Sequence, residues 1–391
     1  MWNLISLEEA YNRLACVKEG NIEYVSLEES LDRVAAENIY SDKNLPGFKK
    51  SMFDGYAVIS EDIDKLEKLN IIGKVNMGKV PEFEIKSGEC AYITTGAMLP
   101  KGANTVVMVE DCDVYENSVR INTTLNDWDN ITFEDEDLKL GDILVKKGQI
   151  IKPYHIAVLA GVGITNIKVK KKINIGIIST GDEIVSPYDE CTIPQIRDIN
   201  GYYLDAHCKI LGCNSKHYGV AKDDKIEFER YVQNALKDND IVILSGASSV
   251  GAKDYTPEIV AKQSDVLFHG VAIKPGKPTL VAKTSDNKYI VGLPGNPLSS
   301  AVSFKLILCK IIDKIYGIHN KELKFKYIIK EDCVNKYNRE FYAPAKIEGN
   351  EVKVINVKSS AISVMLNIDG FIKISKDKTI IKKGEEVEVI I

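Results

Sequence analysis

The spacing of hydrophobic residues changes along the chain, and its clearest pattern lies in the second half. From residue 173, short apolar runs alternate with segments of helical spacing; the runs are 173–178, 215–220, 240–244, 266–271 and 289–292, and the helical segments are 201–211, 224–237, 256–263 and 298–312. Short continuous apolar runs are typical of buried strands, and strands that alternate with helices indicate a parallel sheet. The pattern therefore predicts a doubly wound α/β domain over residues 173–318.

The first 172 residues follow a different pattern. Between residues 70 and 125, glycines separate short apolar runs, which is typical of a β meander or barrel. Two Ser-Leu-Glu-Glu sequences, at 6–9 and 26–29, have the spacing of capping boxes and predict short helices through about Cys16 and about Ala36. A helical run at 154–160 follows the β-rich stretch. We therefore expect an elongated N-terminal domain (1–45 and 138–172) of helices and strands, with a β-rich domain inserted at 46–137.

Two more segments complete the predicted organisation. Residues 168–172 include four lysines and are expected to form a linker into the α/β domain. After residue 323 the helical spacing ends, and short alternating runs recur to the C-terminus. These runs predict a small C-terminal β domain over residues 319–391.

Composition argues against several classes of protein. The net charge of −5 gives no basic footprint for nucleic acid, and no apolar run is long enough to span a membrane. The N-terminus lacks a basic region followed by an apolar one, so we expect no secretion signal. The eight cysteines are scattered without a CxxC pair, which fits reduced thiols. We expect a cytoplasmic protein that binds neither nucleic acid nor membrane.

Five polar segments follow the predicted strands of the α/β domain and should meet at one edge of the sheet, where open α/β sheets bind ligands. They are Ser-Thr-Gly-Asp-Glu at 179–183, Asp223-Asp224, Ser-Gly-Ala-Ser-Ser-Val-Gly at 245–251 with Asp254 beyond it, Lys-Pro-Gly-Lys at 274–277, and Gly-Leu-Pro-Gly-Asn-Pro-Leu-Ser-Ser at 292–300. Glycine turns and hydroxyls can wrap a phosphate or another oxyanion, and lysines can neutralise it. Carboxylates would repel that anion unless a divalent cation such as Mg²⁺ lies between them. The segments together predict metal-assisted chemistry on a phosphate ester or anhydride.

The candidate residues on this edge have distinct expected roles. Glu183, Asp223 and Asp254 are the candidate Mg²⁺ ligands. The turns and lysines supply the candidate substrate contacts, which are Thr180, Gly181, Asp223, Asp224, Ser245, Gly246, Ser249, Gly251, Lys274, Lys277, Pro294, Gly295, Asn296 and Ser299. Simpler interpretations stay open, because Asp223-Asp224 suits the N-cap of the next helix and the two lysines could be ordinary surface residues.

Four further segments extend the pattern: Pro46-Gly-Phe, Ser-Met-Phe-Asp-Gly-Tyr-Ala at 51–57, Thr95-Gly-Ala, and Ile-Arg-Asp-Ile-Asn at 196–200. In order and spacing, the whole set resembles the molybdopterin molybdenumtransferases, and the scaffold protein gephyrin carries a similar domain. The resemblance covers nearly the whole chain. It implies the last step of molybdenum cofactor synthesis, in which molybdate enters adenylylated molybdopterin and AMP is released, with Mg²⁺ required.

The resemblance also implies which residues surround the site. Asp54, Asp137, Glu183 and Asp254 would be catalytic; Thr95 and Asp223 or Asp224 would lie beside them, and Lys274 and Lys277 would face the anions. Ser363 is a further candidate anion contact from the C-terminal domain. A homodimer is implied, with the cleft formed between the α/β domain of one subunit and the inserted β domain of the other. A molybdopterin adenylyltransferase would be the upstream partner.

Some residues depart from the pattern of this family. Thr132 stands where an Arg is expected, and Asp135 stands where a Gly is expected. An Arg offers a forked donor that Thr cannot replace, and an added acid should weaken anion binding. Ala247 and Ile199 are further departures, at a usual Gly and a usual Ser. Two alternatives therefore stay open: a catalytically weakened molybdopterin-binding or scaffold protein, and a molybdopterin adenylyltransferase, which needs only the α/β domain.

Overall fold

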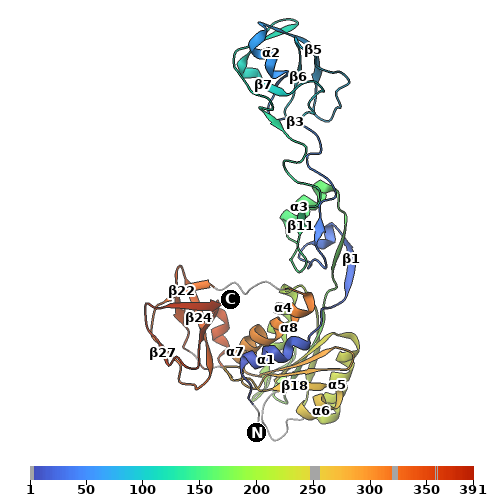
Figure 1. Ribbon diagram of the computed structural model, residues 1–391. Helices are drawn as coiled ribbons and strands as arrows, with labels where there is room; N and C mark the ends of the chain where they lie inside the picture. Colours follow the sequence, from blue (N-terminus) through green and yellow to red (C-terminus); the bar gives the residue numbers. More distant parts are fainter. Residues whose placement is uncertain (1–3, 247–255, 319–324, 357, 359) are drawn as a thin grey trace.

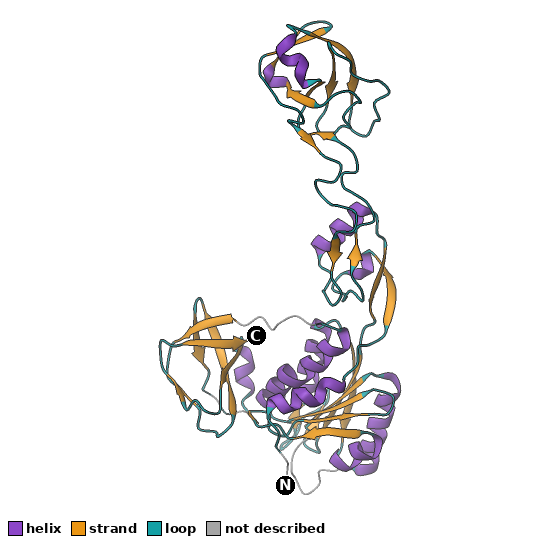
Figure 2. Ribbon diagram, in the orientation of Figure 1, coloured by secondary structure: helices purple, strands orange, loops and turns teal. Residues whose placement is uncertain are grey.

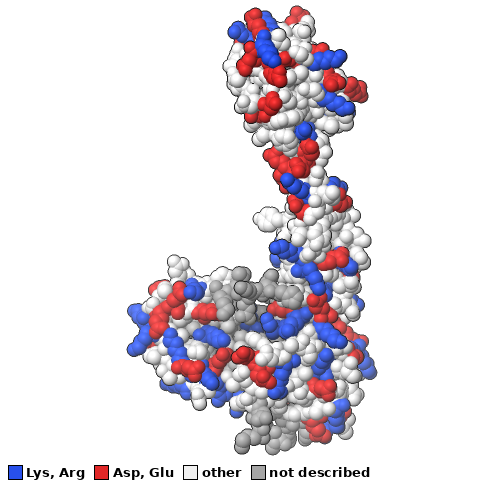
Figure 3. Space-filling view, in the orientation of Figure 1, with Lys and Arg blue, Asp and Glu red and all other residues white. Residues whose placement is uncertain are grey.

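The computed structural model describes residues 4–246, 256–318, 325–356, 358 and 360–391. The molecule is elongated: an α/β domain and a small β domain lie side by side at one end, and a narrow stem carries another β domain to the opposite end (Figures 1 and 2). Basic and acidic side chains are interspersed over the visible face (Figure 3). Among the described residues, no helix is long and apolar enough to cross a membrane. The predicted multidomain α/β architecture is confirmed.

The α/β domain is built on a six-stranded sheet. Its order is β16 (Asn214–Ala221), β13 (Asn174–Thr180), β17 (Ile241–Ser245), β21 (Tyr289–Leu293), β20 (Leu280–Lys283) and β18 (Asp265–His269). The first four strands are parallel, whereas β20 is antiparallel to both of its neighbours. The sequence pattern predicted every strand except β20. Because β20 reverses direction, β18 again runs parallel to β21, and the segment after β18 lies at the same edge as the ends of the parallel strands.

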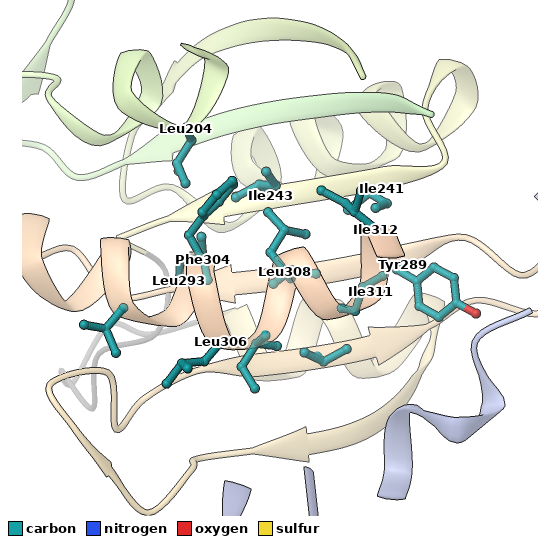
Figure 4. Close-up of a cluster of buried hydrophobic side chains, with 14 of the residues drawn as sticks. Leu204, Ile241, Ile243, Tyr289, Leu293, Phe304, Leu306, Leu308, Ile311 and Ile312 are labelled. Atoms are coloured by element: carbon teal, nitrogen blue, oxygen red, sulfur yellow. The ribbon is translucent and has the colours of Figure 1, made fainter. Parts of the chain in front are cut away.

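Apolar side chains cover both faces of this sheet because alternate residues of a strand point to opposite sides. Ile241 and Ile243 join one cluster, part of which Figure 4 shows, and Val242 and Leu244 join the other. The first cluster includes residues of α1 (Leu7–Arg13), α4 (Asn200–Ile210), α7 (Pro297–Ser303), a π-helical turn (Phe304–Leu308) and α8 (Cys309–Tyr316). The second includes residues of α5 (Lys225–Asp238) and α6 (Thr256–Gln263). Burial on both faces explains why these strands are continuous apolar runs in the sequence.

The stem consists of two short strand pairs and one helix. β1 (Ile22–Ser26) pairs with β12 (Asn166–Lys170), and β2 (Ile39–Tyr40) pairs with β11 (Ile143–Val145). α3 (Pro153–Val162) confirms the helix expected at 154–160, and its Leu159 is buried in the small stem core. Both strand pairs join residues before the inserted domain to residues after it, so the chain runs out along the stem and returns beside itself.

One of the two predicted capping boxes opens no helix. Ser6 caps α1, which a 3₁₀ turn at Leu14–Cys16 extends as expected. Ser26 exchanges the same reciprocal bonds with Glu29, but only a 3₁₀ turn at Glu28–Ser30 follows. The predicted helix to Ala36 is therefore wrong. The physical reason is tertiary: the next residues bridge to the returning chain, where Ala35 faces Val169.

The predicted linker at 168–172 is also partly wrong, because residues 168–170 belong to β12. Val169 is buried in the stem core, while the lysines on either side of it bind acids. Lys168 Nζ lies 2.9 Å from Glu37, and Lys170 Nζ, with a side chain only 5% exposed, lies 2.6 Å from Glu19. The lysine run thus reflects the alternation of a strand.

The inserted domain carries a six-stranded sheet and one short helix. Its order is β7 (Thr105–Met108), β4 (Gly55–Val58), β6 (Glu89–Ile93), β5 (Leu69–Val75), β9 (Ser118–Ile121) and β8 (Cys112–Val114), with α2 at Ser60–Lys65 and a 3₁₀ turn at Val109–Asp111. β3 (Lys50–Ser51) pairs with β10 (Ile131–Thr132) where the domain meets the stem. Gly55 is required here, because a Cβ would lie 2.8 Å from the carbonyl carbon of Val107.

The C-terminal domain is a closed β structure. Its sheet has the order β19 (Ile273–Lys274), β24 (Glu340–Glu348), β25 (Glu351–Val354), β22 (Phe325–Ile329), β28 (Glu386–Ile390) and β26 (Gly370–Ile374), and a further β24–β26 pairing closes it. A smaller pair joins β23 (Cys333–Val334) to β27 (Ile380–Ile381), and a 3₁₀ helix spans Ile362–Leu366. β19 comes from the α/β domain, so backbone pairing attaches the segment around Lys274 to this domain.

Candidate active site

A cavity of about 540 Å³ opens at the carboxyl edge of the parallel strands. Nine of the sequence-predicted residues line it: Thr180, Gly181, Glu183, Asp223, Asp224, Ser245, Gly246, Gly295 and Asn296. They come from four segments that follow β13, β16, β17 and β21. The parallel order of these strands brings together residues that are more than 100 positions apart in the chain.

Hydrogen bonds join the turns of this cavity to one another. Thr180 Oγ1 donates to the Ser245 carbonyl at 3.0 Å, and Gly246 N donates to the Leu293 carbonyl at 3.1 Å. Gly246 has φ of 92°, and a Cβ there would lie 2.7 Å from the Thr180 carbonyl oxygen. Only glycine meets both requirements. The turns are therefore held in place before any ligand binds.

A buried carboxylate, which the sequence did not assign, lies in the wall. Asp198 is 7% exposed and accepts three hydrogen bonds: from Ser179 Oγ at 2.5 Å, His217 Nε2 at 3.0 Å and Gly201 N at 2.9 Å. Burial alone would raise the pKa of Asp198, but these donors outweigh it and hold the pKa below its ordinary value. Asp198 thus joins the end of β13 and the middle of β16 to the start of α4.

Asn200 is a second wall residue without a predicted role. Its Nδ2 donates to the Gly295 carbonyl at 2.8 Å, so the start of α4 is tied to the turn after β21. The segment 196–200 contributes to the family resemblance. Its polar residues between apolar neighbours were the only feature of the local sequence that could have indicated a role for Asp198 or Asn200. His217, which bonds to Asp198, is itself partly exposed.

The outer acids of the cavity differ from Asp198 because they are exposed. Glu183 has no ion pair among the described residues, and Asp223 N donates to Asp182 Oδ1 at 3.0 Å. Asp224 Oδ1 accepts from Glu227 N at 2.8 Å, so the N-cap interpretation of Asp224 is confirmed. The nearby cations are turned to the backbone: Lys222 Nζ bonds the carbonyls of Asp182 and Ile184. Among the described residues, the rim therefore offers the Glu183 carboxylate without a lysine or arginine in an ion pair with it.

The carboxylates of this cavity could supply only part of the ligand shell of a hard divalent cation. Within the described ranges, no three His, Cys, Asp or Glu side chains lie close enough together to hold a metal ion. Mg²⁺ commonly takes one or two carboxylates and completes its shell with water and substrate phosphate oxygens. Glu183 and Asp223 are compatible with that kind of site, whereas Asp198 already has three donors. Asp254, Ser249 and Gly251 lie outside the described residues.

Several predicted residues do not line this cavity. Lys274 lies in β19 with its Nζ 5.1 Å from the centroid of the Tyr337 ring, and Lys277 is exposed nearby in sequence. Pro294 is buried, and Ser299 is buried within α7. Ser363 is exposed on a 3₁₀ helix, while Ser360, three residues earlier, lines the cavity.

The remaining predicted residues belong to the inserted domain and the top of the stem. Thr95 N donates to Asp54 Oδ1 at 2.7 Å, and both residues are exposed. Asp137 is exposed, and its N donates to the Leu45 carbonyl. Asp135 is paired with Lys139 at 3.4 Å. The inserted domain lies at the opposite end of the molecule from the cavity (Figure 1), so these residues can reach such a cavity only in a second chain.

Comparison with known proteins accounts for all four domains. The MoeA N-terminal region, domains I and II, matches residues 5–163; the "Probable molybdopterin binding domain" matches 176–314; and the MoeA C-terminal region, domain IV, matches 328–391. A molybdopterin molybdenumtransferase of Staphylococcus epidermidis is 33% identical over 99% of this chain and 95% of its own. The chain belongs to the molybdopterin molybdenumtransferase family.

Other members of this family agree in sequence and in structure. A molybdopterin molybdenumtransferase of Haemophilus influenzae is 35% identical over 75% of this chain and 73% of its own. The crystal structure of the molybdopterin biosynthesis MoeA protein from Pyrococcus horikosii superposes with a TM-score of 0.90 at 34% identity, covering 99% of this chain and 98% of that one. The likeness therefore extends to the arrangement of the domains.

Proposed function

We propose that this chain inserts molybdate into adenylylated molybdopterin and cleaves the phosphoanhydride in a Mg²⁺-dependent reaction, giving molybdenum cofactor and AMP. The observation that carries the proposal is the cavity at the carboxyl edge of the sheet, where glycine turns and exposed carboxylates lie together. Membership of the family and relatives named for this transfer support it.

The residues divide into two groups in this proposal. The turns at Gly181, Gly246 and Gly295 would form the surface on which the phosphates and the oxyanion bind, because glycine lets the backbone approach a ligand closely. Glu183 and Asp223 would hold Mg²⁺, with Asp254 as a third candidate. Mg²⁺ supplies charge neutralisation on the phosphate oxygens, which makes AMP a better leaving group. Lys274 and Lys277 would attract molybdate, and Ser360 or Ser363 would contact it from the C-terminal domain.

A homodimer is part of the proposal because one chain does not complete the site. Thr95 N donates a hydrogen bond to the Asp54 carboxylate, and both residues are exposed to solvent. Asp137 is also exposed, in the same part of the molecule. We place all three against the cavity of the partner chain. A molybdopterin adenylyltransferase is the proposed source of the substrate.

The first experiment measures AMP release from adenylylated molybdopterin with Mg²⁺ and either molybdate or tungstate. Glu183→Gln should lower the rate about 100-fold, because a neutral amide is a poor ligand for a hard cation. Glu190→Gln is the matched control: Glu190 is exposed in the same segment between β13 and α4 and does not line the cavity. Equal rates for both variants would contradict the assigned role of Glu183.

Mixed dimers test the shared site. Asp54→Ala and Glu183→Gln chains should each be inactive alone. After mixing, heterodimers should have one intact site in two, so activity should return to about a quarter of wild type. No recovery, with heterodimers shown to form, would place Asp54 outside the partner's site.

A weakened binding protein is the second candidate, favoured by Thr132 and Asp135. Tight binding of the adenylylated substrate without AMP release would support it. The double variant Thr132→Arg/Asp135→Gly should then gain activity, because it restores the residues expected in the family. Consumption of ATP and molybdopterin would instead support the adenylyltransferase alternative.

A further inference from the structure

A second cavity, of about 320 Å³, lies at the opposite edge of the α/β sheet, where the stem joins the domain. It is bounded by residues 18–21, which lead to β1, by 171–174, which lead from β12 to β13, and by 286–289, which lead to β21. These segments carry the N-terminal ends of the strands, so the cavity is separate from the candidate active site and independent of the proposed function.

The acidic residues in the wall of this cavity already have hydrogen-bond or ion-pair partners. Glu19 is paired with Lys170 at 2.6 Å and Lys147 at 3.1 Å. Asp286 accepts from Thr284 Oγ1 at 2.5 Å and lies 3.6 Å from Lys288. The third acid, Asp240, accepts from Asn174 N at 2.8 Å.

Three lysines of the same wall have no such partner. Lys18, Lys171 and Lys172 are exposed, and none of them makes an ion pair within the described part of the chain. Two of them are adjacent residues at the stem junction, and all three contribute positive charge to the wall of this cavity. A bound anion would neutralise this charge.

A buried hydroxyl in the wall has no acceptor for its proton among the described residues. Tyr289 is 2% exposed and lines the cavity, and its Oη makes no hydrogen bond of normal geometry with the described residues. Figure 4 shows its hydroxyl turned away from the apolar side chains of the core. Burial raises the pKa of Tyr289, which the nearby Lys18 N–H only partly offsets, so the hydroxyl stays protonated and can donate. An unsatisfied buried hydroxyl is costly unless a ligand or water completes it.

We propose that this cavity binds a phosphate-class oxyanion, with Lys18, Lys171 and Lys172 supplying charge and Tyr289 supplying a buried donor. Oxyanions offer several acceptor oxygens, which suits one hydroxyl and several ammonium groups. The volume leaves room for a small phosphorylated molecule as well as for inorganic phosphate. Because the cavity wall joins the stem to the α/β domain, a bound anion would hold the two together.

Isothermal titration calorimetry with inorganic phosphate and with pyrophosphate tests the site on the full-length protein. Lys171→Ala/Lys172→Ala should weaken binding about tenfold or more, since it removes two of the charges. Lys382→Ala/Lys383→Ala is the matched control: it removes an adjacent pair of exposed lysines in the C-terminal domain and should leave affinity unchanged. Equal affinity of all three proteins would overturn the proposal, as would binding that requires Mg²⁺ and is lost only when Glu183 or Asp223 is changed.

Tyr289→Phe separates the hydroxyl from the charges. Without phosphate, it should raise the melting temperature, because it removes an unsatisfied buried group. With phosphate, it should show a smaller stabilisation than wild type, because the donor is gone. A lower melting temperature without phosphate would show that the hydroxyl already has a partner, and would remove Tyr289 from the site.

Discussion

The buried Asp198 allows a quantitative test of how the candidate site is held together. Its carboxylate accepts from Ser179, His217 and Gly201, and both Asp198 and Ser179 are almost fully buried. Asp198→Ala leaves three donors unpaired in the wall. Breaking a buried charge network costs about 3–5 kcal/mol, and the three bonds do not add independently. We expect a loss of about 3–5 kcal/mol for Asp198→Ala and about 1–3 kcal/mol for Asp198→Asn, whose amide can still accept.

The measurement must report on the α/β domain. Trp128 lies in the inserted domain, and its fluorescence would not report on the α/β domain. Urea unfolding followed by circular dichroism, with hydrogen exchange of the α4 amides, is therefore the suitable assay. Asp205→Ala is the control on the same helix: Asp205 binds Lys209 and Ser215 at a more exposed position and should cost about 1 kcal/mol. A cost below about 1 kcal/mol for Asp198→Ala would refute the argument that this network fixes the cavity wall.

The pH dependence of this effect has a definite sign. The pKa of Asp198 is lowered on folding from an ordinary value of 3.8. The unfolded chain therefore binds its proton first as the pH falls, and the contribution of Asp198 to stability is fully present above pH 3.8. The difference in unfolding free energy between wild type and Asp198→Asn should shrink as the pH falls below that value, through the folded pKa.

Two other substitutions test separate features. Gly55→Ala should destabilise the inserted domain by about 3 kcal/mol or more, because the new methyl group would overlap the Val107 carbonyl. Gly78→Ala should cost only about 1–2 kcal/mol, because Gly78 has φ of 76° but a Cβ there would meet no atom within 4 Å. Urea unfolding followed by Trp128 fluorescence compares the two variants. Asp224→Ala should cost about 1 kcal/mol through the lost N-cap, whereas Asp224→Asn should keep the cap and the stability. If AMP release nevertheless falls in Asp224→Asn, its carboxylate has a role beyond capping, and if it does not, Asp223 is the acid that acts.

The sequence predicted the elements whose signal is local. Strands such as β17 are buried on both faces and read as continuous apolar runs, and α6 has the predicted bounds. The second capping box failed because identical local chemistry, Ser26 with Glu29, was overridden by strand pairing around Ala35. β20 was missed because four residues beside a glycine and proline turn carry little periodic signal.

The candidate site was predicted where residues directly follow parallel strands. Thr180, Asp223 and Ser245 meet at the cavity for that reason alone. The role of Asp198 was not predicted because its partners Ser179 and His217 lie on two different strands. No spacing in the chain shows that three donors converge on one carboxylate. Lys274 was expected at the same edge, but pairing of β19 with β24 attaches it to the C-terminal domain instead of the cavity wall.

The buried carboxylate of Asp198 and the exposed carboxylate of Glu183 have different physical roles at this cavity. Asp198 can be buried only because three donors satisfy it, and a carboxylate so engaged has little capacity left for a cation. Glu183 is exposed and has no described ion pair, so losing its charge should cost the fold little. Changes at Asp198 should therefore appear first in stability and in protection of the α4 amides. Changes at Glu183 should appear in AMP release from a protein of unchanged stability, and this separation distinguishes the residues that build the cavity from those that act in it.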